Sequence, residues 1–311
     1  MTIQVIRDWR DLPDTSKGAA VAIGAFDGVH RGHQAVIVAA KVVADQIGAP
    51  LGVVSFAPHP RRWFQPDAAP FRLMTLDQMA RALEPLGVER FYVLPFDAEM
   101  AAMSDTDFTE KVLHTGLGIR HAAVGFDFTY GKGRTGSPQA LAAQGEGLGF
   151  TVSRVSRHDD PHGLKLSSSA VREALKAGDM DRAAVILGRP FAIAGEVVHG
   201  EKRGRTIGVP TANVRLGGYM RPAYGVYATR TRLPDGRVID GVANLGVRPM
   251  FEIEEPLLEV WLFDFNESLY GQTVETELVA LLRGEMNFDS LDALKVQIDA
   301  DAEAARAVLK P

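Results

Sequence analysis

Cysteine is absent from all 311 residues of the sequence. A disulfide, a thiolate nucleophile and a cysteine-ligated zinc site are therefore excluded, and the composition favours a reducing compartment. Long hydrophobic runs are missing too, because no uncharged stretch approaches the ~18 apolar residues of a membrane-spanning helix. The first eight residues include charges where a secretory signal would carry its apolar segment. We therefore expect a soluble protein of the cytoplasm that has no membrane partner.

The sequence also lacks an excess of positive charge. The chain has 34 Lys and Arg residues against 39 Asp and Glu residues, which gives a net charge of −5. Because binding to a phosphate backbone depends on clustered cations in net excess, we expect no nucleic-acid partner. A local basic pocket for a small phosphorylated ligand stays compatible with this balance.

The composition that is present is typical of a globular protein, with 46% hydrophobic and 23% charged residues. The length of 311 residues is about twice the usual ~150 residues of one domain. We therefore expect two domains, and the change of pattern along the chain places them at 1–186 and 187–311.

The first half of the chain alternates short apolar runs with helical patterns. Buried strands are predicted over 19–23, 51–56, 91–94 and 122–124, and helices over 34–46, 76–86 and 108–113. Strands that alternate with helices indicate a parallel sheet covered on both faces, and ligands of such sheets bind beyond the carboxyl ends of the strands. The fold class expected for this half is therefore α/β, with a Rossmann-like parallel sheet.

The first half ends with two short predicted helices, over 170–175 and 181–187, and either Ser168 or Ser169 is expected as the N-cap of the first. Five extended runs follow, separated by Gly, Pro and Asp-Gly turns, at 193–198, 226–230, 238–242, 257–265 and 274–282. This pattern indicates a small antiparallel β-barrel. A last helix is predicted with Ser290 as its N-cap, and one of its faces should pack on the barrel through Leu291, Leu294, Ile298, Ala305 and Leu309.

The strongest motif of the first half is GAFDGVHRGH at 24–33, directly after a predicted strand. Glycines let the backbone approach a ligand closely, and a helix start offers free N–H donors and a positive dipole end to phosphate. His30 and His33 lie three residues apart, so both can hydrogen-bond one phosphate chain. A glycine turn with two surface histidines is the alternative, but it would not need both imidazoles. Zinc binding lacks further ligands nearby, and the residue order of a Walker loop is missing.

Two later stretches fit the same site. GFDFTYGKGRTG at 125–136 combines aromatic rings with cations, and SSSAVR at 167–172 places hydroxyls and Arg172 at a helix start. An ordinary glycine-rich loop or a capped helix explains either stretch taken alone. Because three such segments follow strands of one sheet, a shared nucleotide site is the better interpretation, and His59 in the turn at 58–62 can add to it.

The second half contains a glycine- and cation-rich segment at 195–213 that ends in two neutral oxygen donors, Thr211 and Asn213. Alternation along an extended chain points both side chains to one side, and a hydroxyl with an amide carbonyl suits a Mg²⁺ ion that bridges substrate phosphates. Glu259 lies in an apolar strand, where an ionised carboxylate is costly unless it is paired or faces a site. A general base beside Mg-ATP is one interpretation of Glu259, and a place on a wet face of the barrel is the other.

At these residues the whole chain resembles the bacterial bifunctional riboflavin kinase/FAD synthetase family. The segments 24–33, 125–136 and 167–172 match its FMN adenylyltransferase module, and the segments 204–213, 244–249 and 269–271, with Glu259, match its riboflavin kinase module. The resemblance implies a nucleotidyltransferase-like N-terminal domain with an HxGH motif and a C-terminal six-stranded antiparallel barrel with a terminal helix. It also implies two reactions: riboflavin and ATP give FMN, and FMN and ATP give FAD and pyrophosphate.

The resemblance implies roles for particular residues. His30 and His33 would hold the ATP phosphates during attack by the FMN phosphate, and Glu259 would accept the proton of the ribityl 5′-hydroxyl. Thr211 and Asn213 would hold Mg²⁺, with ATP as co-substrate. The residues implied to bind nucleotide or flavin are, in the first domain, Gly24, Phe26, Asp27, Gly28, His59, Asp127, Phe128, Arg134, Ser168, Ser169 and Arg172 and, in the second, Gly204, Arg205, Gly208, Pro210, Asn244, Arg283 and Glu285.

The sequence departs from the usual family pattern at several positions. Ala25 stands where Asn is common and Ser169 where Thr is usual, while Thr129 and Tyr130 replace a usual Arg-Phe pair; in the second half, Met250 and Trp261 replace Thr and His. Two alternative functions therefore stay open. One is a riboflavin kinase whose adenylyltransferase domain is inactive or narrowed, and the other is a flavin-binding regulator without catalysis.

Overall fold

The computed structural model describes residues 2–156, 163, 166–199, 209–246 and 256–310 of the chain. These residues form two compact units, each of which has its own architecture. The first unit comprises Met1–Ala68 and Leu76–Ser167, and the second comprises Ala69–Thr75 and Ser168–Pro311. No helix in the described part of the chain is both long enough and apolar enough to cross a bilayer.

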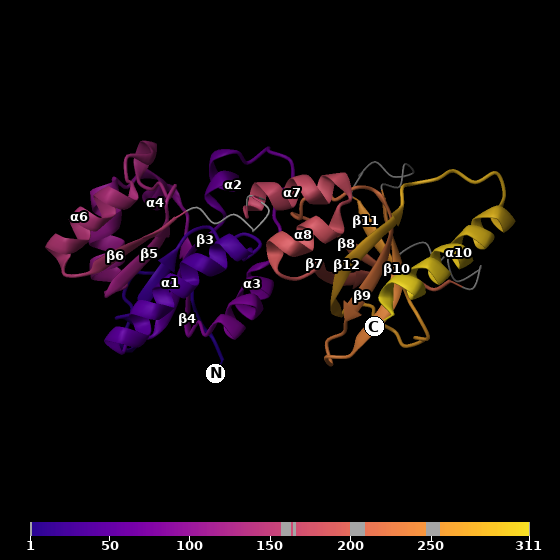
Figure 1. The fold of residues 1–311 in the computed structure, drawn as a ribbon, viewed down its shortest axis with the longest axis horizontal. Coiled ribbons are helices and arrows are strands. Elements are labelled where there is room, and N and C mark those ends of the chain that lie inside the picture. The colour runs from indigo at the N-terminus through magenta and orange to yellow at the C-terminus, as the bar shows by residue number, and fades with distance from the viewer. Residues whose placement is uncertain (1, 157–162, 164–165, 200–208, 247–255, 311) are drawn as a thin grey trace. The chain divides into compact units, whose positions relative to one another are not determined.

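A parallel sheet of six strands forms the centre of the first unit (Figure 1). The strands lie in the order β1-β4-β3-β2-β5-β6, and every neighbouring pair is parallel. The direction of winding reverses between β2 and β5, and ligands of doubly wound sheets bind at such a switch point. The predicted parallel α/β sheet is therefore confirmed. Its strands are β1 (Gln4–Ile6), β2 (Ala20–Ile23), β3 (Leu51–Ala57), β4 (Arg90–Pro95), β5 (His121–Gly125) and β6 (Thr151–Val155).

Helices connect these strands close to the predicted places. The helix predicted over 76–86 is divided into α3 and a 3₁₀ turn that contains Pro85, a residue without the N–H that a continuing α-helix needs. The helix predicted over 108–113 lies inside a π-helical segment. The bounds are η1 (Asp14–Ser16), α1 (Arg31–Ile47), α2 (Pro60–Phe64), α3 (Leu76–Leu83), η2 (Glu84–Leu86), α4 (Ala98–Ala102), α5 (Asp105–Asp107), η3 (Phe108–Gly116), η4 (Lys132–Arg134) and α6 (Pro138–Leu148).

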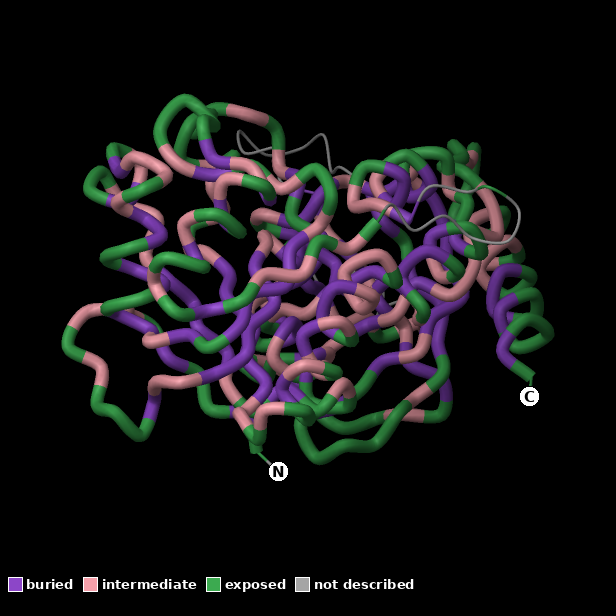
Figure 2. Tube along the Cα trace, turned by 60° about the vertical axis from the view of Figure 1, so that its left-hand side comes forward, coloured by how far each residue is buried: buried purple, intermediate pink, exposed green. Residues whose placement is uncertain are grey.

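The core of the first unit lies on the central strands. All four residues of β2 are buried, as are the first five of β3, which is the pattern of strands covered on both faces. α1 packs on β2 and β5, so the segment that joins β2 to α1 is held between two buried elements. Figure 2 shows the buried residues along the interior of the trace and the exposed residues mainly in the connections.

A closed antiparallel barrel of six strands forms the centre of the second unit (Figure 1). Its strands lie in the order β10-β11-β8-β7-β12-β9, which confirms the expected six-stranded barrel. Ser290 caps the last helix as predicted, because its Oγ accepts a hydrogen bond from Ala293 N at 3.1 Å. The bounds are α7 (Ser168–Ala177), α8 (Met180–Leu187), β7 (Phe191–Val198), β8 (Ala212–Arg215), β9 (Gly225–Arg232), β10 (Val238–Gly246), β11 (Leu257–Leu262), β12 (Thr273–Arg283) and α10 (Leu291–Leu309).

Only part of the predicted apolar face of α10 packs on the barrel. Ala305 and Leu309 are buried against barrel residues that include Val226 and Val242. Leu291, by contrast, is 56% exposed, so the prediction that it packs on the barrel is wrong. The first turns of α10 stand off from the barrel because a cavity lies between them, as described below.

The start of α7 also differs from the sequence prediction. The helix begins at Ser168, so Ser168 and Ser169 lie in its first turn and neither is the N-cap. α7 and α8 group with the barrel in the second compact unit. The domain limit between 186 and 187, which was placed by the change of pattern along the sequence, stays a prediction.

A buried histidine lies at the start of β5 in the first unit. His121 is 2% exposed, and its Nδ1 lies 2.7 Å from Thr151 Oγ1 on β6. Burial lowers the pKa of the imidazole, because the charged form loses hydration. The folded protein therefore holds His121 neutral, and acid favours the unfolded chain, in which the ring can take up a proton.

We expect the folded state to lose stability as the pH falls through about 6.5, the pKa of histidine in an unfolded chain. This loss should be smaller in His121→Asn, which cannot titrate, and unchanged in His114→Asn, which alters an exposed histidine. Thermal unfolding followed by circular dichroism between about pH 7.5 and pH 5.5 measures both slopes. Equal slopes for wild type and His121→Asn would show that another group causes the pH dependence.

Candidate active sites

The segment after β2 follows an unusual backbone path. Phe26, Gly28 and Val29 have φ values of 51°, 91° and 40°, all in the left-handed region that residues other than glycine rarely adopt. Phe26 and Val29 are fully buried, so packing compensates for this conformation. Ser55 Oγ of β3 donates a hydrogen bond to Ala25 O at 2.9 Å and holds the same turn from the neighbouring strand.

The two predicted histidines meet at the N-terminus of α1. His30 is the N-cap, and its Nδ1 accepts a hydrogen bond from His33 N at 3.2 Å. The two rings stack with centroids 3.6 Å apart. Because Nδ1 accepts, the proton of a neutral His30 is on Nε2, through which the ring can donate to an anion. The predicted placement of both rings at one helix start is therefore confirmed.

Gly32 allows this close arrangement. A Cβ at position 32 would lie 2.5 Å from Leu166 O and 3.1 Å from the ring of His30. Phe26 contacts His33 from another side, with ring centroids 5.1 Å apart. The imidazoles therefore have fixed positions, as charge stabilisation at a reacting phosphate requires.

The second predicted loop follows β5, the direct neighbour of β2 in the sheet. Phe128 stacks on Tyr130, with ring centroids 5.4 Å apart, and Arg134 Nε donates to Thr129 Oγ1 at 2.9 Å. Tyr130 is buried, and its hydroxyl donates to Gln144 Oε1 at 3.1 Å. The tyrosine that departs from the family pattern is thus a core residue with a satisfied hydroxyl, whereas Asp127 and Arg134 are exposed on the loop.

The remaining predicted residues of the adenylyltransferase module lie in other elements. His59 caps α2, since its Nδ1 accepts from Arg61 N at 3.0 Å. Arg172 Nε donates to Phe71 O at 2.8 Å inside the second compact unit. The two serines at the start of α7 belong to that same unit. Their participation in one site with His30 and His33 stays a prediction.

The barrel aligns three predicted residues in one row across adjacent strands. Glu259 on β11 lies opposite Asn213 on β8 and opposite Asn244 on β10. Side chains of directly opposite residues on one face have Cβ atoms about 5 Å apart. Asn213 is 4% exposed, and its Oδ1 has no hydrogen-bond partner among the described residues. The sequence-predicted oxygen donor is therefore a buried acceptor beside the predicted base.

A cavity of about 620 Å³ lies between this face of the barrel and the first turns of α10. Its wall includes five predicted residues, namely Thr211, Asn244, Glu259, Arg283 and Glu285, together with apolar and aromatic side chains from both elements, among them Trp261, Phe288, Leu294 and Ile298.

Asp301 of α10, which the sequence analysis missed, lies in the wall of the same cavity. Arg283 forms a two-pronged ion pair with it, at 2.9 Å from Nε to Oδ1 and 2.7 Å from Nη2 to Oδ2. The position of Asp301, three residues after Ile298 and on the predicted apolar face of the helix, was the signal in the sequence. The guanidinium of Arg283 therefore holds α10 at the cavity, and Glu285 packs against the backbone of Gly246.

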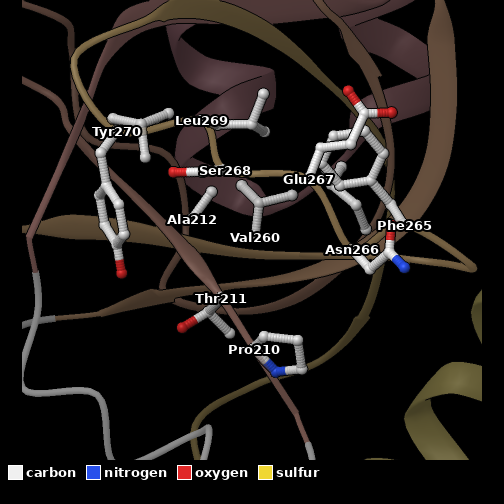
Figure 3. Close-up of a pocket in the computed structure, with 12 residues that line it drawn as sticks. Pro210, Thr211, Ala212, Val260, Phe265, Asn266, Glu267, Ser268, Leu269 and Tyr270 are labelled. Carbon is white, nitrogen blue, oxygen red and sulfur yellow. The ribbon is translucent and has the colours of Figure 1, made fainter.

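A second cavity, of about 420 Å³, opens beside the first. Figure 3 shows Pro210 and Thr211 on one side of it and the loop 265–270 on the other. Thr211 lines both cavities. Gly204, Arg205 and Gly208, which the sequence also predicts for this site, lie outside the described residues.

Comparisons with known proteins agree with both halves of this arrangement. A family model described as FAD synthetase matches residues 12–170, and one described as riboflavin kinase matches residues 187–309. A bifunctional riboflavin kinase/FMN adenylyltransferase from Haemophilus influenzae is 41% identical over 305 residues, which cover 98% of this chain and 99% of that protein. The chain belongs to the bifunctional riboflavin kinase/FMN adenylyltransferase family.

Further relatives and one solved structure extend this result. Proteins of the same name from Pseudomonas fluorescens and Bacillus subtilis are 42% and 40% identical; the first match covers 99% of both chains, and the second covers 98% of this chain and 96% of that protein. A crystal structure described as a macrolide-efflux protein from Streptococcus pneumoniae superposes with a TM-score of 0.86 at 31% identity, over 98% of this chain and 99% of that one. The predicted riboflavin kinase/FAD synthetase resemblance is therefore confirmed over the whole chain.

We expect Gly32→Ala to lower FMN adenylyltransferase activity about 100-fold, because the added Cβ displaces His30 or Leu166 and misplaces the imidazoles. Riboflavin kinase activity should not change, since the barrel is a separate compact unit. The matched control is Gly147→Ala in α6, where a Cβ meets nothing within 4 Å. Separate assays of FAD and FMN formation measure both effects, and full transferase activity in Gly32→Ala would show that this packing is not needed.

Proposed function

We propose that this chain phosphorylates riboflavin with ATP to give FMN in its barrel unit, and transfers AMP from ATP to FMN in its parallel-sheet unit, giving FAD and pyrophosphate. The observation that carries this proposal is the row of Asn213, Glu259 and Asn244 next to two adjoining cavities of about 620 Å³ and 420 Å³. Thr211 lines both cavities and so marks the boundary between them. A phosphoryl transfer between two bound substrates takes place at such a boundary.

The larger cavity suits riboflavin. Trp261, Phe288 and the apolar side chains of α10 offer flat surfaces to a tricyclic ring, while charged residues stand at other parts of the wall. Glu259 lies in the same wall and would accept the proton of the ribityl 5′-hydroxyl as that oxygen attacks the γ-phosphorus, while the bond from the γ-phosphorus to the β,γ-bridging oxygen breaks and ADP leaves. Asn244 and Glu285 would hydrogen-bond the polar end of the substrate, and Arg283 would hold the wall in place.

The smaller cavity suits the nucleotide. Its lining includes the apolar side chains of Val197, Val260 and Leu262 and polar groups of Thr211 and the loop 265–270. We assign Pro210 and the segment with Gly204, Arg205 and Gly208 to binding of ATP. Thr211 would then stand where the γ-phosphate meets the flavin hydroxyl.

The residues beside this boundary fit Mg²⁺. The buried Oδ1 of Asn213 lacks a partner among the described residues, and Thr211 supplies a second neutral oxygen. Bound there, the ion would neutralise charge on the transferring phosphoryl group. Asn213 also lies opposite Glu259 in the sheet register, so the proposed Mg²⁺ ligand is the direct neighbour of the proposed base.

In the parallel-sheet unit, the N-terminus of α1 would bind the ATP phosphates. Backbone N–H groups and the helix dipole attract them, and His30 and His33 add donors through fixed rings. The FMN phosphate would attack the α-phosphorus in line, so no covalent enzyme intermediate is required. The same site would include Gly24, Phe26, Asp27, Gly28, His59, Asp127, Phe128 and Arg134 of this unit.

Incubation of the protein with riboflavin, Mg²⁺ and ATP, followed by chromatography of the flavins, tests the proposal. We expect FMN to form first and FAD to follow, since the product of one unit is the substrate of the other. FMN without FAD would contradict the bifunctional assignment and leave a riboflavin kinase. Flavin binding without consumption of ATP would instead indicate a regulator.

Glu259→Gln should lower kcat of the kinase reaction by about 10²- to 10⁴-fold, the usual contribution of a general base. FAD formation from supplied FMN should stay at the wild-type rate, because the transferase site lies in the other unit. Glu277→Gln on β12 removes a carboxylate elsewhere on the same barrel and serves as the matched control. Retained kinase activity in Glu259→Gln would exclude this glutamate as the base.

A further inference from the structure

The loop between β11 and β12 forms one wall of the smaller cavity of the barrel. Phe265, Asn266 and Glu267 line that cavity together with the next three residues of the loop. Backbone hydrogen bonds fix both ends of this connection: Phe263 N donates to Asp240 O, and Gly271 N donates to Val197 O. The middle of the loop lies between these two anchors.

Arg237, in the turn between β9 and β10, holds the middle of the loop. Its Nη1 and Nη2 donate to the two carboxylate oxygens of Glu267, at 2.7 Å and 2.9 Å. Its guanidinium also lies 5.8 Å from the ring centroid of Phe265. Asp235 in turn fixes the guanidinium, since its Oδ2 accepts from Arg237 Nε at 2.7 Å. The planar fork of arginine therefore makes a contact that a lysine could not reproduce.

The ion pair with Arg237 also fixes the position of the negatively charged Glu267 carboxylate. Glu267 borders a cavity that we assign to a nucleotide triphosphate, and a carboxylate that turned into it would repel the phosphates. Figure 3 shows the Glu267 carboxylate directed away from Thr211 and Pro210. Arg237 lowers the pKa of Glu267 through this ion pair, which favours the ionised carboxylate.

We propose that Arg237 is a positioning residue of the kinase site, which binds the Glu267 carboxylate outside the nucleotide cavity and so permits tight binding of ATP. The inference rests on the assignment of the smaller cavity to ATP. Arg237 contacts no substrate in this scheme. It acts through Glu267, so its loss should weaken the binding of ATP and leave the binding of riboflavin unchanged.

The decisive measurement is the steady-state kinetics of the kinase reaction in full-length variants. Arg237→Ala should raise KM for ATP about fivefold, the range that a well-formed exposed ion pair supports, with kcat and KM for riboflavin unchanged. Glu267→Gln should leave KM for ATP at or below the wild-type value. Adding Glu267→Gln to Arg237→Ala should return KM for ATP towards wild type, because no carboxylate is left to repel the phosphates.

Two further variants separate positioning from a general loss of structure. Arg237→Lys keeps the charge without the fork and should give an intermediate KM for ATP. Arg232→Ala removes an exposed arginine from the same hairpin, outside this contact, and should match wild type. Raised ionic strength should reduce the difference between Arg237→Ala and wild type, since screening weakens the repulsion.

The outcomes are distinct. An unchanged KM for ATP in Arg237→Ala, or a defect of the same size in the double variant, would overturn the inference while the kinase assignment stands. A wild-type protein that forms no FMN from riboflavin would overturn the kinase assignment, and the inference with it. FAD formation from supplied FMN, which uses ATP in the other unit, should be the same in all these variants.

Discussion

The hydrogen-bond register between β8, β11 and β10 is the constraint on which the barrel site depends. It places Asn213, Glu259 and Asn244 in one row, on the face that α10 partly covers. Because side chains alternate along a strand, a slip of one residue would turn Glu259 to the opposite face. Closure of the barrel leaves no edge strand that could slip, so the fold that buries the core also fixes Glu259, the proposed base, beside the two asparagine side chains.

In the parallel-sheet unit, a helix N-terminus and not a strand register positions the predicted site residues. The phosphate site that we propose there lies at a helix start, where the donors are backbone N–H groups and the rings of His30 and His33 lie at the cap and in the first turn. Left-handed residues and a glycine that excludes a Cβ keep this turn tight. The neighbouring loop follows β5, which pairs directly with β2, so the reversal of strand order brings two phosphate-type segments to one edge.

Sequence patterns predicted the parts of this architecture that local physics controls. The apolar runs of β2 to β5 are strands buried on both faces, and such runs are visible in composition alone. The predictions omitted the edge strands β1 and β6, which are half-exposed and carry little apolar signal, and the four-residue β8. The two cavities and the pairing of Arg283 with Asp301 arise from contacts between distant elements, which no local pattern encodes.

Two of the carboxylates in the cavity walls are paired with arginine in a similar way, which composition could not show. A chain with a net charge of −5 must bind polyanionic substrates, so acidic residues on the cavity walls are a liability. Arg283 pairs with Asp301 at the larger cavity, and Arg237 pairs with Glu267 at the smaller one, each through both carboxylate oxygens. In the mechanism that we propose, neither of these two carboxylates takes part in a step of the reaction. Glu259, the proposed base, is positioned differently, by the sheet register beside Asn213 and Asn244.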